Sequence, residues 1–154
     1  MAILKGKSKL FPIRSYEGVG PILFGMSPEA VRKALGDRFE VFNKYGWAHP
    51  SDAFDGLGIH VRYSPSGLCA TVEFGDRSSA SPTYEGRELL DEPMDELLRW
   101  AERADPNITI DDDGFDSPAL GLGVYAPGIL DEPDATRASG VTVFGPGGLG
   151  QGLL

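Results

Sequence analysis

The spacing of apolar residues predicts a short amphipathic helix between Ser27 and Gly36. Ser27 can accept a hydrogen bond from an unpaired backbone N–H, and Pro28 suits the first helical position because its missing donor costs nothing there. Gly36 is the residue type expected at a left-handed stop. The apolar positions of this helix are Ala30, Val31, Ala34 and Leu35. We therefore expect Arg32 and Lys33 to face water.

A second helix is predicted in the segment DEPMDELLRWAERAD, residues 91–105. Either Asp91 or Glu92 opens it beside Pro93, and Asp105 ends it. The residues at the spacing of one buried helical face are Met94, Leu97, Leu98 and Ala101. Trp100 lies on the flank of this face, so we expect it to pack against the core.

Alternating apolar and polar residues predict a β-hairpin over residues 58–75. Its first strand places Ile59, Val61 and Tyr63 on one face, so His60 should point the other way, beside Arg62. The segment SPSG supplies the turn. On the return strand, Ala70, Val72 and Phe74 alternate with Cys69, Thr71 and Glu73. The following residues, 75–86, are polar and are interpreted as a linker.

These elements indicate an α+β fold: a largely antiparallel sheet with two short helices on one face. The order suggests a helix-plus-three-strand unit repeated twice, over residues 18–76 and 83–145. Each half would be only marginally stable in isolation, so we expect one domain over residues 1–154. The glycine-rich tail, 145–154, is expected to be mobile.

The charge of the chain is strongly asymmetric. Residues 1–77 carry a balance of +2 and residues 78–154 a balance of −11, which gives the net charge of −9. Like charges repel, so the second half is not expected to bind nucleic acid. The asymmetry favours either simple solubility or a basic partner.

Composition favours a cytoplasmic protein with no membrane contact. The sequence has no run of about 20 apolar residues. Lysines interrupt the apolar residues of the N-terminus, so no signal peptide is expected there. The lone cysteine, Cys69, cannot form an internal disulfide, and in a strand it is usually a small buried hydrophobe.

The string GPILFGMSPEAVRKALG, residues 20–36, resembles the GMT-x-E-x-V-x-x-x-LG opening of small bacterial proteins of two sorts. One is the helix-plus-sheet module of the β-lactamase inhibitor protein and of outer-membrane assembly lipoproteins. The other is the immunity proteins that neutralise polymorphic toxins. Ser27 replaces the usual Thr. The resemblance covers 17 of 154 residues and implies a fold of this kind. In its inhibitor and immunity branches it also implies binding of a protein rather than catalysis.

Two acidic segments are the first candidate binding surface. Their carboxylates could imitate the phosphates that a basic nuclease cleft binds, which would steer association and block the site. A calcium loop is not expected, since Phe115 stands where another ligand is needed and no Glu occupies the required offset. The residues of this candidate surface are Asp111, Asp112, Asp113, Asp116, Asp131, Glu132 and Asp134.

An aromatic group is the second choice for a partner-binding surface. Exposed aromatic side chains anchor many protein interfaces, and Tyr45, Trp47 and Phe54 surround a segment rich in turn formers. Packing at the core edge is the alternative for Trp47. These residues and the acidic surface are the two partner-binding candidates.

Catalytic and cofactor motifs are not found in the sequence. Ser51 and Asp52 follow His49, but no nucleophile-elbow glycine pattern accompanies them. No catalytic residue, metal or cofactor is predicted. The sequence thus favours an immunity protein that covers the active site of a cognate toxin with an acidic surface. The alternatives are a small enzyme or ligand-binding protein with a site near His49 or His60, and a module of an envelope assembly.

Overall fold

A computed structural model describes residues 9–43 and 46–147. In these ranges the chain forms two helices, α1 (Pro28–Leu35) and α2 (Met94–Ala104), and thirteen strands. The α+β class predicted from the sequence is confirmed. The strands are β1 Lys9–Arg14, β2 Gly18–Val19, β3 Ile22–Leu23, β4 Glu40–Phe42, β5 Ser51–Phe54, β6 Ile59–Tyr63, β7 Cys69–Gly75, β8 Ala80–Tyr84, β9 Arg87–Glu88, β10 Thr109–Asp111, β11 Gly114–Ser117, β12 Leu122–Tyr125 and β13 Gly140–Phe144.

Eight of the described strands form a large antiparallel sheet in the order β10-β11-β12-β13-β7-β6-β5-β4. Each helix precedes a four-stranded meander, β4–β7 after α1 and β10–β13 after α2. The two meanders join where their last strands, β7 and β13, pair. Each unit therefore has one strand more than the sequence pattern predicted.

The remaining five described strands form a small sheet in the order β3-β2-β1-β8-β9. Its centre is a parallel pair, β1 with β8. The interpretation of residues 75–86 as a linker was wrong, because β8 is almost entirely buried. Its polar residues tolerate burial because the backbone pairs with β1, and because Ser81 Oγ lies 3.3 Å from Glu88 Oε1.

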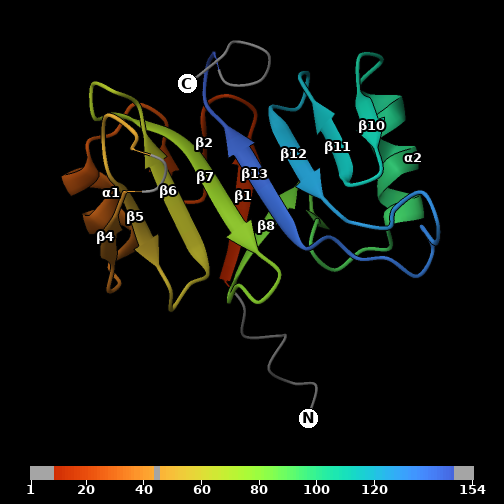
Figure 1. The fold of residues 1–154 in the computed structure, drawn as a ribbon, viewed down its shortest axis with the longest axis horizontal. Helices are drawn as coiled ribbons and strands as arrows, with labels where there is room; N and C mark the ends of the chain where they lie inside the picture. Colours follow the sequence, from red (N-terminus) through yellow and green to blue (C-terminus); the bar gives the residue numbers. More distant parts are fainter. Residues whose placement is uncertain (1–8, 44–45, 148–154) are drawn as a thin grey trace.

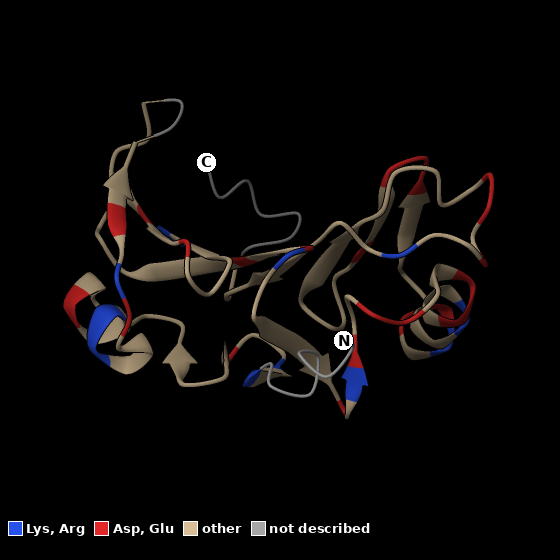
Figure 2. Ribbon diagram, turned by 90° about the horizontal axis from the view of Figure 1, so that it is seen from below, with Lys and Arg blue, Asp and Glu red and all other residues tan. Residues whose placement is uncertain are grey.

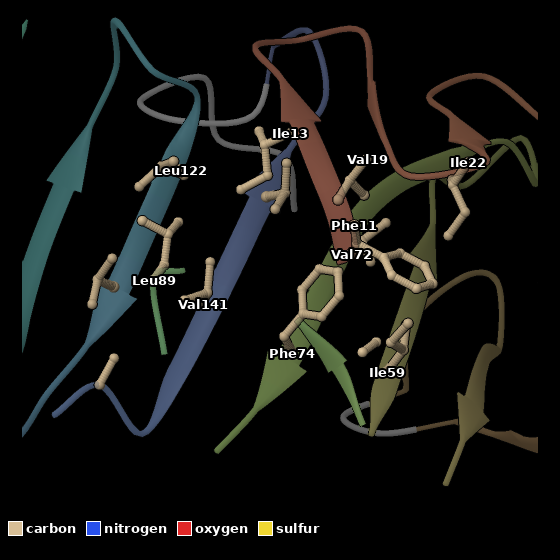
Figure 3. Packing of buried hydrophobic residues seen from close by; sticks show 14 of the residues in the cluster. Phe11, Ile13, Val19, Ile22, Ile59, Val72, Phe74, Leu89, Leu122 and Val141 are labelled. Atoms are coloured by element: carbon tan, nitrogen blue, oxygen red, sulfur yellow. The ribbon is translucent and has the colours of Figure 1, made fainter. Parts of the chain in front are cut away.

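The two helices and the small sheet lie on the same face of the large sheet (Figures 1 and 2). Apolar side chains of both sheets interlock between them, as Figure 3 shows, and the rings of Phe11 and Phe74 meet edge-on with centroids 5.8 Å apart. The opposite face of the large sheet carries no helix or strand among the described residues. We call it the bare face.

The predicted helix ends are confirmed at both ends of α1 and at the C-cap of α2, Asp105, but not at the start of α2. Ser27 Oγ accepts a hydrogen bond from Ala30 N, and Gly36 adopts a left-handed φ of 60°, as predicted. At α2 neither acidic residue caps the helix. Pro93 takes the N-cap position, and the carbonyls of Pro133 and Thr136 accept from Asp95 N and Met94 N. A distant loop therefore supplies this cap.

The predicted hairpin, β6–β7, is present, but a β-bulge changes its alternation near the turn. The register shifts between Arg62 and Tyr63, so Cys69 pairs with Tyr63 and Thr71 pairs with Arg62. The assignment of Cys69 to the face of Thr71 was therefore wrong. Cys69 is buried in the core, and burial raises the pKa of its thiol to about 12.

Candidate functional site

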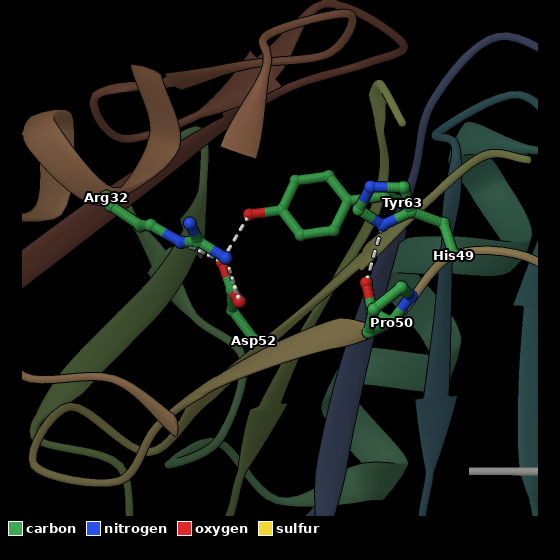
Figure 4. A network of polar contacts seen from close by, with 5 residues as sticks. All are labelled: Arg32, His49, Pro50, Asp52 and Tyr63. Atoms are coloured by element: carbon green, nitrogen blue, oxygen red, sulfur yellow. Dashed lines mark hydrogen bonds and ion pairs between the residues drawn. The ribbon is translucent and has the colours of Figure 1, made fainter. Parts of the chain in front are cut away.

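A buried carboxylate ties α1 to the covered face of the large sheet (Figure 4). Asp52, 0% exposed, accepts hydrogen bonds from Arg32 Nε and Arg32 Nη2, each at 2.8 Å, and from the Tyr63 hydroxyl at 2.7 Å. The expectation that Arg32 faces water was wrong, because its guanidinium turns inward to form this ion pair. Lys33, by contrast, is exposed.

Hydrogen bonding and burial set the proton affinities in this network. The hydrogen bond to Asp52 raises the pKa of Arg32. Burial, followed by the hydrogen bond to Asp52 and then the Asp52 charge, raises the pKa of Tyr63 well above its ordinary value. Both groups therefore hold their protons at neutral pH, and both donate to one carboxylate. The network fixes the start of β5, the strand that follows the loop bearing Trp47.

The structure separates the residues once considered for a catalytic triad. The His49 ring Nδ1 lies 2.8 Å from the carbonyl oxygen of Pro50, and the ring meets the edge of Tyr63 (Figure 4). Asp52 is held by Arg32 and Tyr63, so it orients no imidazole. Ser51 alternates with Asp52 in β5 and points to the opposite face of the sheet. These residues form no relay.

One end of the bare face carries an aromatic and cationic group around Trp47. The Arg62 guanidinium lies over the Trp47 ring, 4.2 Å from its centroid, and the Phe42 and His60 rings lie 5.2 Å apart. His60 and Arg62 point away from Ile59 and Val61, as predicted. Two hollows of about 390 and 400 Å³ adjoin Trp47 and Arg62. We call this group, with Ser51 and Thr71, the Trp47 end.

Two hydroxyls at the Trp47 end are buried without a hydrogen-bond partner among the described residues. They belong to Ser51, 1% exposed, and Thr71, 2% exposed. Thr71 pairs with Arg62 across β7 and β6, and one step along the β5–β6 register places Ser51 on the other side of Arg62. Arg62 thus lies between Ser51 and Thr71 in the sheet, one on each neighbouring strand.

The opposite end of the large sheet, beside α2, carries the predicted acidic residues, which we call the acidic end. Its two segments are connected through the residues between them: Ala126 N donates to Asp113 O, Gly128 N donates to Asp112 O, and Asp131 N and Glu132 N donate to Gly128 O. All seven of its acidic residues are exposed. In Figure 2 their red segments gather at the end of the molecule that bears α2. The structure therefore brings the two exposed segments to the same end of the molecule.

A small hollow of about 220 Å³ lies beside this acidic surface. Asp111, Asp116 and Gly123 line it, and a Cβ placed on Gly123 would lie 2.5 Å from Asp116 Oδ1. Partial burial, followed by repulsion from Asp111, raises the pKa of Asp116. The carboxylates of this hollow are therefore crowded, and a positive group would relieve their repulsion.

The second acidic segment also has a structural role. The loop that contains Asp131, Glu132 and Asp134 supplies the carbonyl groups that cap α2. Negative side chains are favourable near the start of a helix because of its dipole. Part of the acidity of this loop is therefore explained without any partner.

The aromatic second-choice group is only partly retained. Phe54 is 0% exposed, because β5 turns its ring into the core, so its assignment to a partner-binding surface was wrong. Tyr45 lies outside the described residues. Trp47 remains, half-buried, on the bare face. Its neighbours Ser51, Arg62 and Thr71 were not proposed as binding residues. Strand alternation did predict that Arg62 points to the face opposite that of Val61.

The fold and surface define an α+β protein with one covered and one bare sheet face. Comparisons with protein-family models, curated proteins and solved structures find no match to this chain. Neither helix in the described ranges has the length and apolar character needed to cross a membrane. The described part of the chain has no cluster of three or more His, Cys, Asp or Glu residues suited to a metal ion.

Proposed function

We propose that the protein binds a protein partner through the bare face, with the acidic end covering a basic surface of that partner. The observation that carries the proposal is that both exposed acidic segments lie at the same end of the large sheet, whose bare face has no covering helix or strand in the described ranges. Charge complementarity of this kind steers association and selects partners.

The resemblance of residues 20–36 to inhibitor and immunity proteins supports a more specific proposal. The partner would be a bacterial toxin, and this protein would neutralise it in the cytoplasm by covering its active site. A cleft that binds phosphates is basic, so a nuclease toxin fits the acidic end best. No catalysis by this protein is needed for that role.

Co-expression tests the immunity role. The gene next to this one on the chromosome is expressed from an inducible promoter in a sensitive host, with or without this protein. Growth should stop with the neighbour alone and resume with both. A harmless neighbour, or one that still kills in the presence of this protein, would contradict the immunity proposal.

Charge reversal tests the acidic end in the resulting complex. The triple variant Asp112→Lys, Asp113→Lys, Asp116→Lys should slow association about tenfold or more at low salt, and the difference should shrink at high salt. The matched control reverses Glu17, Glu85 and Glu102, which are exposed and lie outside the bare face. Stopped-flow association rates that fall equally for both triples would indicate net charge rather than this surface.

A further inference from the structure

We propose that the hollow lined by Asp111, Asp116 and Gly123 binds the side chain of one arginine of the protein partner. The inference rests on the proposed function for the owner of that arginine. The shape and charge of the hollow belong to the free protein. They give the acidic end one position with a defined occupant.

The register of the large sheet builds the hollow around Gly123. This residue lies on β12 between Asp116 of β11 and Thr142 of β13, and strand alternation points all three positions to the bare face. Gly123 has no positive φ, so the backbone does not require glycine there. Glycine inside a regular strand often marks a place where another group approaches closely. A Cβ at Gly123 would lie 2.5 Å from Asp116 Oδ1, so its absence lets the Asp116 carboxylate reach over β12 at the hollow of about 220 Å³.

The two carboxylates of the hollow are open to a donor from outside. Asp116 accepts no hydrogen bond within the described ranges, and Asp111 accepts one, at Oδ1 from Asp113 N at 2.8 Å. No lysine or arginine from the described part of the chain lines the hollow. A cation that enters therefore meets unoccupied acceptors and relieves the repulsion that contributes to the raised pKa of Asp116.

Two aromatic rings make an arginine a better occupant than a lysine or a metal ion. Tyr125, 54% exposed, and Phe144, half-buried, line the hollow, and the β12–β13 register places them on opposite sides of Gly123. A guanidinium can stack on a ring face while its edge donates to carboxylates, which an ammonium group cannot do as well. A metal ion would need more ligands than the two carboxylates that line the hollow beside these rings.

The first experiment uses Nα-acetyl-arginine N-methylamide as the probe and needs no partner. Nuclear magnetic resonance of the labelled full chain should show saturable shifts at the amides of Gly123 and Tyr125, with a dissociation constant in the millimolar range. The citrulline derivative, which has a similar shape without the charge, should produce no such shifts. The lysine derivative should bind at least about threefold more weakly than the arginine probe. Equal binding of the lysine derivative, or saturation by calcium chloride without saturation by the arginine probe, would overturn the proposal.

Substitutions in the hollow separate a binding role from a structural role. Gly123→Ala should weaken binding of the arginine probe about fivefold or more, because its Cβ displaces the Asp116 carboxylate, and Asp116→Asn should weaken it similarly. Both should leave the thermal midpoint of the probe-free protein unchanged or raise it, since alanine suits a strand better than glycine and asparagine removes a repelled charge. A lowered midpoint in both variants would show a structural role and would overturn the proposal.

Gly75→Ala is the matched control for Gly123→Ala. Gly75 also lies on the bare face without a positive φ, but it lies outside the hollow, and a Cβ there would meet no atom within 4 Å. This variant should bind the arginine probe as the wild type does. An equal loss of binding in the two alanine variants would contradict a site at Gly123.

The complex then identifies the source of the arginine. With the partner bound, the arginine probe should no longer shift Gly123, and Gly123→Ala should raise the dissociation rate constant of the complex at least about tenfold. An unchanged rate constant in a complex that still forms would overturn the arginine site while the proposed function stands. If the neighbouring gene fails the growth test but the arginine probe still saturates the hollow, the proposed function fails while the site itself stands.

Discussion

Ser51 and Asp52 are adjacent in β5 and equally buried, yet they differ completely in hydrogen bonding. Asp52 points to the covered face and accepts three hydrogen bonds. Ser51 points to the bare face and has no partner in the described ranges. The difference shows that the polar groups of β5 are satisfied by the fold on the covered face but not on the bare face.

Asp105 and Asp116 repeat this contrast in the second half of the chain. Asp105 is 1% exposed at the end of α2, and it accepts from Ser117 Oγ at 2.6 Å and from Ala119 N at 3.0 Å. Burial raises the pKa of Asp105, but these hydrogen bonds and one from Asn107 N lower it by more. Asp116 lacks such donors, and its pKa is raised. Asp105 therefore stabilises the fold as an anion, whereas Asp116 is under repulsion.

The largest effect is expected from removing the carboxylate of the covered face. Asp52→Ala leaves the Tyr63 hydroxyl buried and Arg32 without its ion-pair partner. The free energy of unfolding should fall by about 3 kcal/mol, because removing one member of a buried ion pair leaves the other without its partner. Urea denaturation measures this change.

Tyr63→Phe is the matched control for this variant. It removes one hydrogen bond and leaves the Arg32–Asp52 pair, so the loss should be only about 1 kcal/mol. Equal losses in the two variants would show that the ion pair contributes nothing beyond the hydroxyl.

A smaller and pH-dependent effect is expected at Asp105. Asp105→Asn replaces an anionic acceptor with a neutral one, and the cost at neutral pH should be about 2 kcal/mol. The folded-state pKa is depressed below 3.8, so the stabilisation is present above the unfolded pKa. It is lost as pH falls through the folded pKa. The difference between wild type and variant should therefore be constant above about pH 5 and shrink below pH 4.

Asp95→Asn provides the comparison for this pH profile. Asp95 forms a 3.8 Å pair with Arg99 on the surface of α2 and accepts one hydrogen bond, from Glu96 N at 2.9 Å. Its substitution should change the free energy of unfolding by no more than about 0.5 kcal/mol. If the Asp105 and Asp95 variants gave the same profile between pH 2 and pH 7, the buried hydrogen bonds of Asp105 would not explain the effect.

Local patterns were sufficient to predict the α+β class, α1 with its cap and stop, and the β6–β7 hairpin. Each depends on residues within a few positions of one another. The parallel pairing of β1 with β8 joins segments about 70 residues apart, so no local pattern could identify the polar segment 80–84 as a buried strand. The bulge that redirects Cys69 likewise depends on the partner strand.

The residues of the candidate site likewise include some that local sequence predicts and some that only the fold brings together. Clustering in the sequence was enough to select the acidic residues, because charges close in the chain remain close in a turn. Arg32 and Asp52 are twenty positions apart, and their pairing requires α1 to pack on β5. The cluster of Arg62 with Trp47 brings a strand residue against a loop residue fifteen positions away, so local patterns did not predict that contact.

The smallest effect is expected at Asp116, and it tests the contrast between Asp116 and Asp105 directly. Its folded-state pKa is raised, so the folded state binds the proton more tightly and loses stability as pH rises through the unfolded and then the folded pKa. Asp116→Asn removes this penalty. The variant should be more stable than wild type at pH 7, by at most about 0.5 kcal/mol because the group is exposed to solvent, and no more stable at pH 3. Thermal midpoints at the two pH values measure it. A loss of stability at pH 7 would mean that the Asp116 carboxylate has favourable partners, and the acidic end would then be a structural cluster rather than a surface that needs a basic partner.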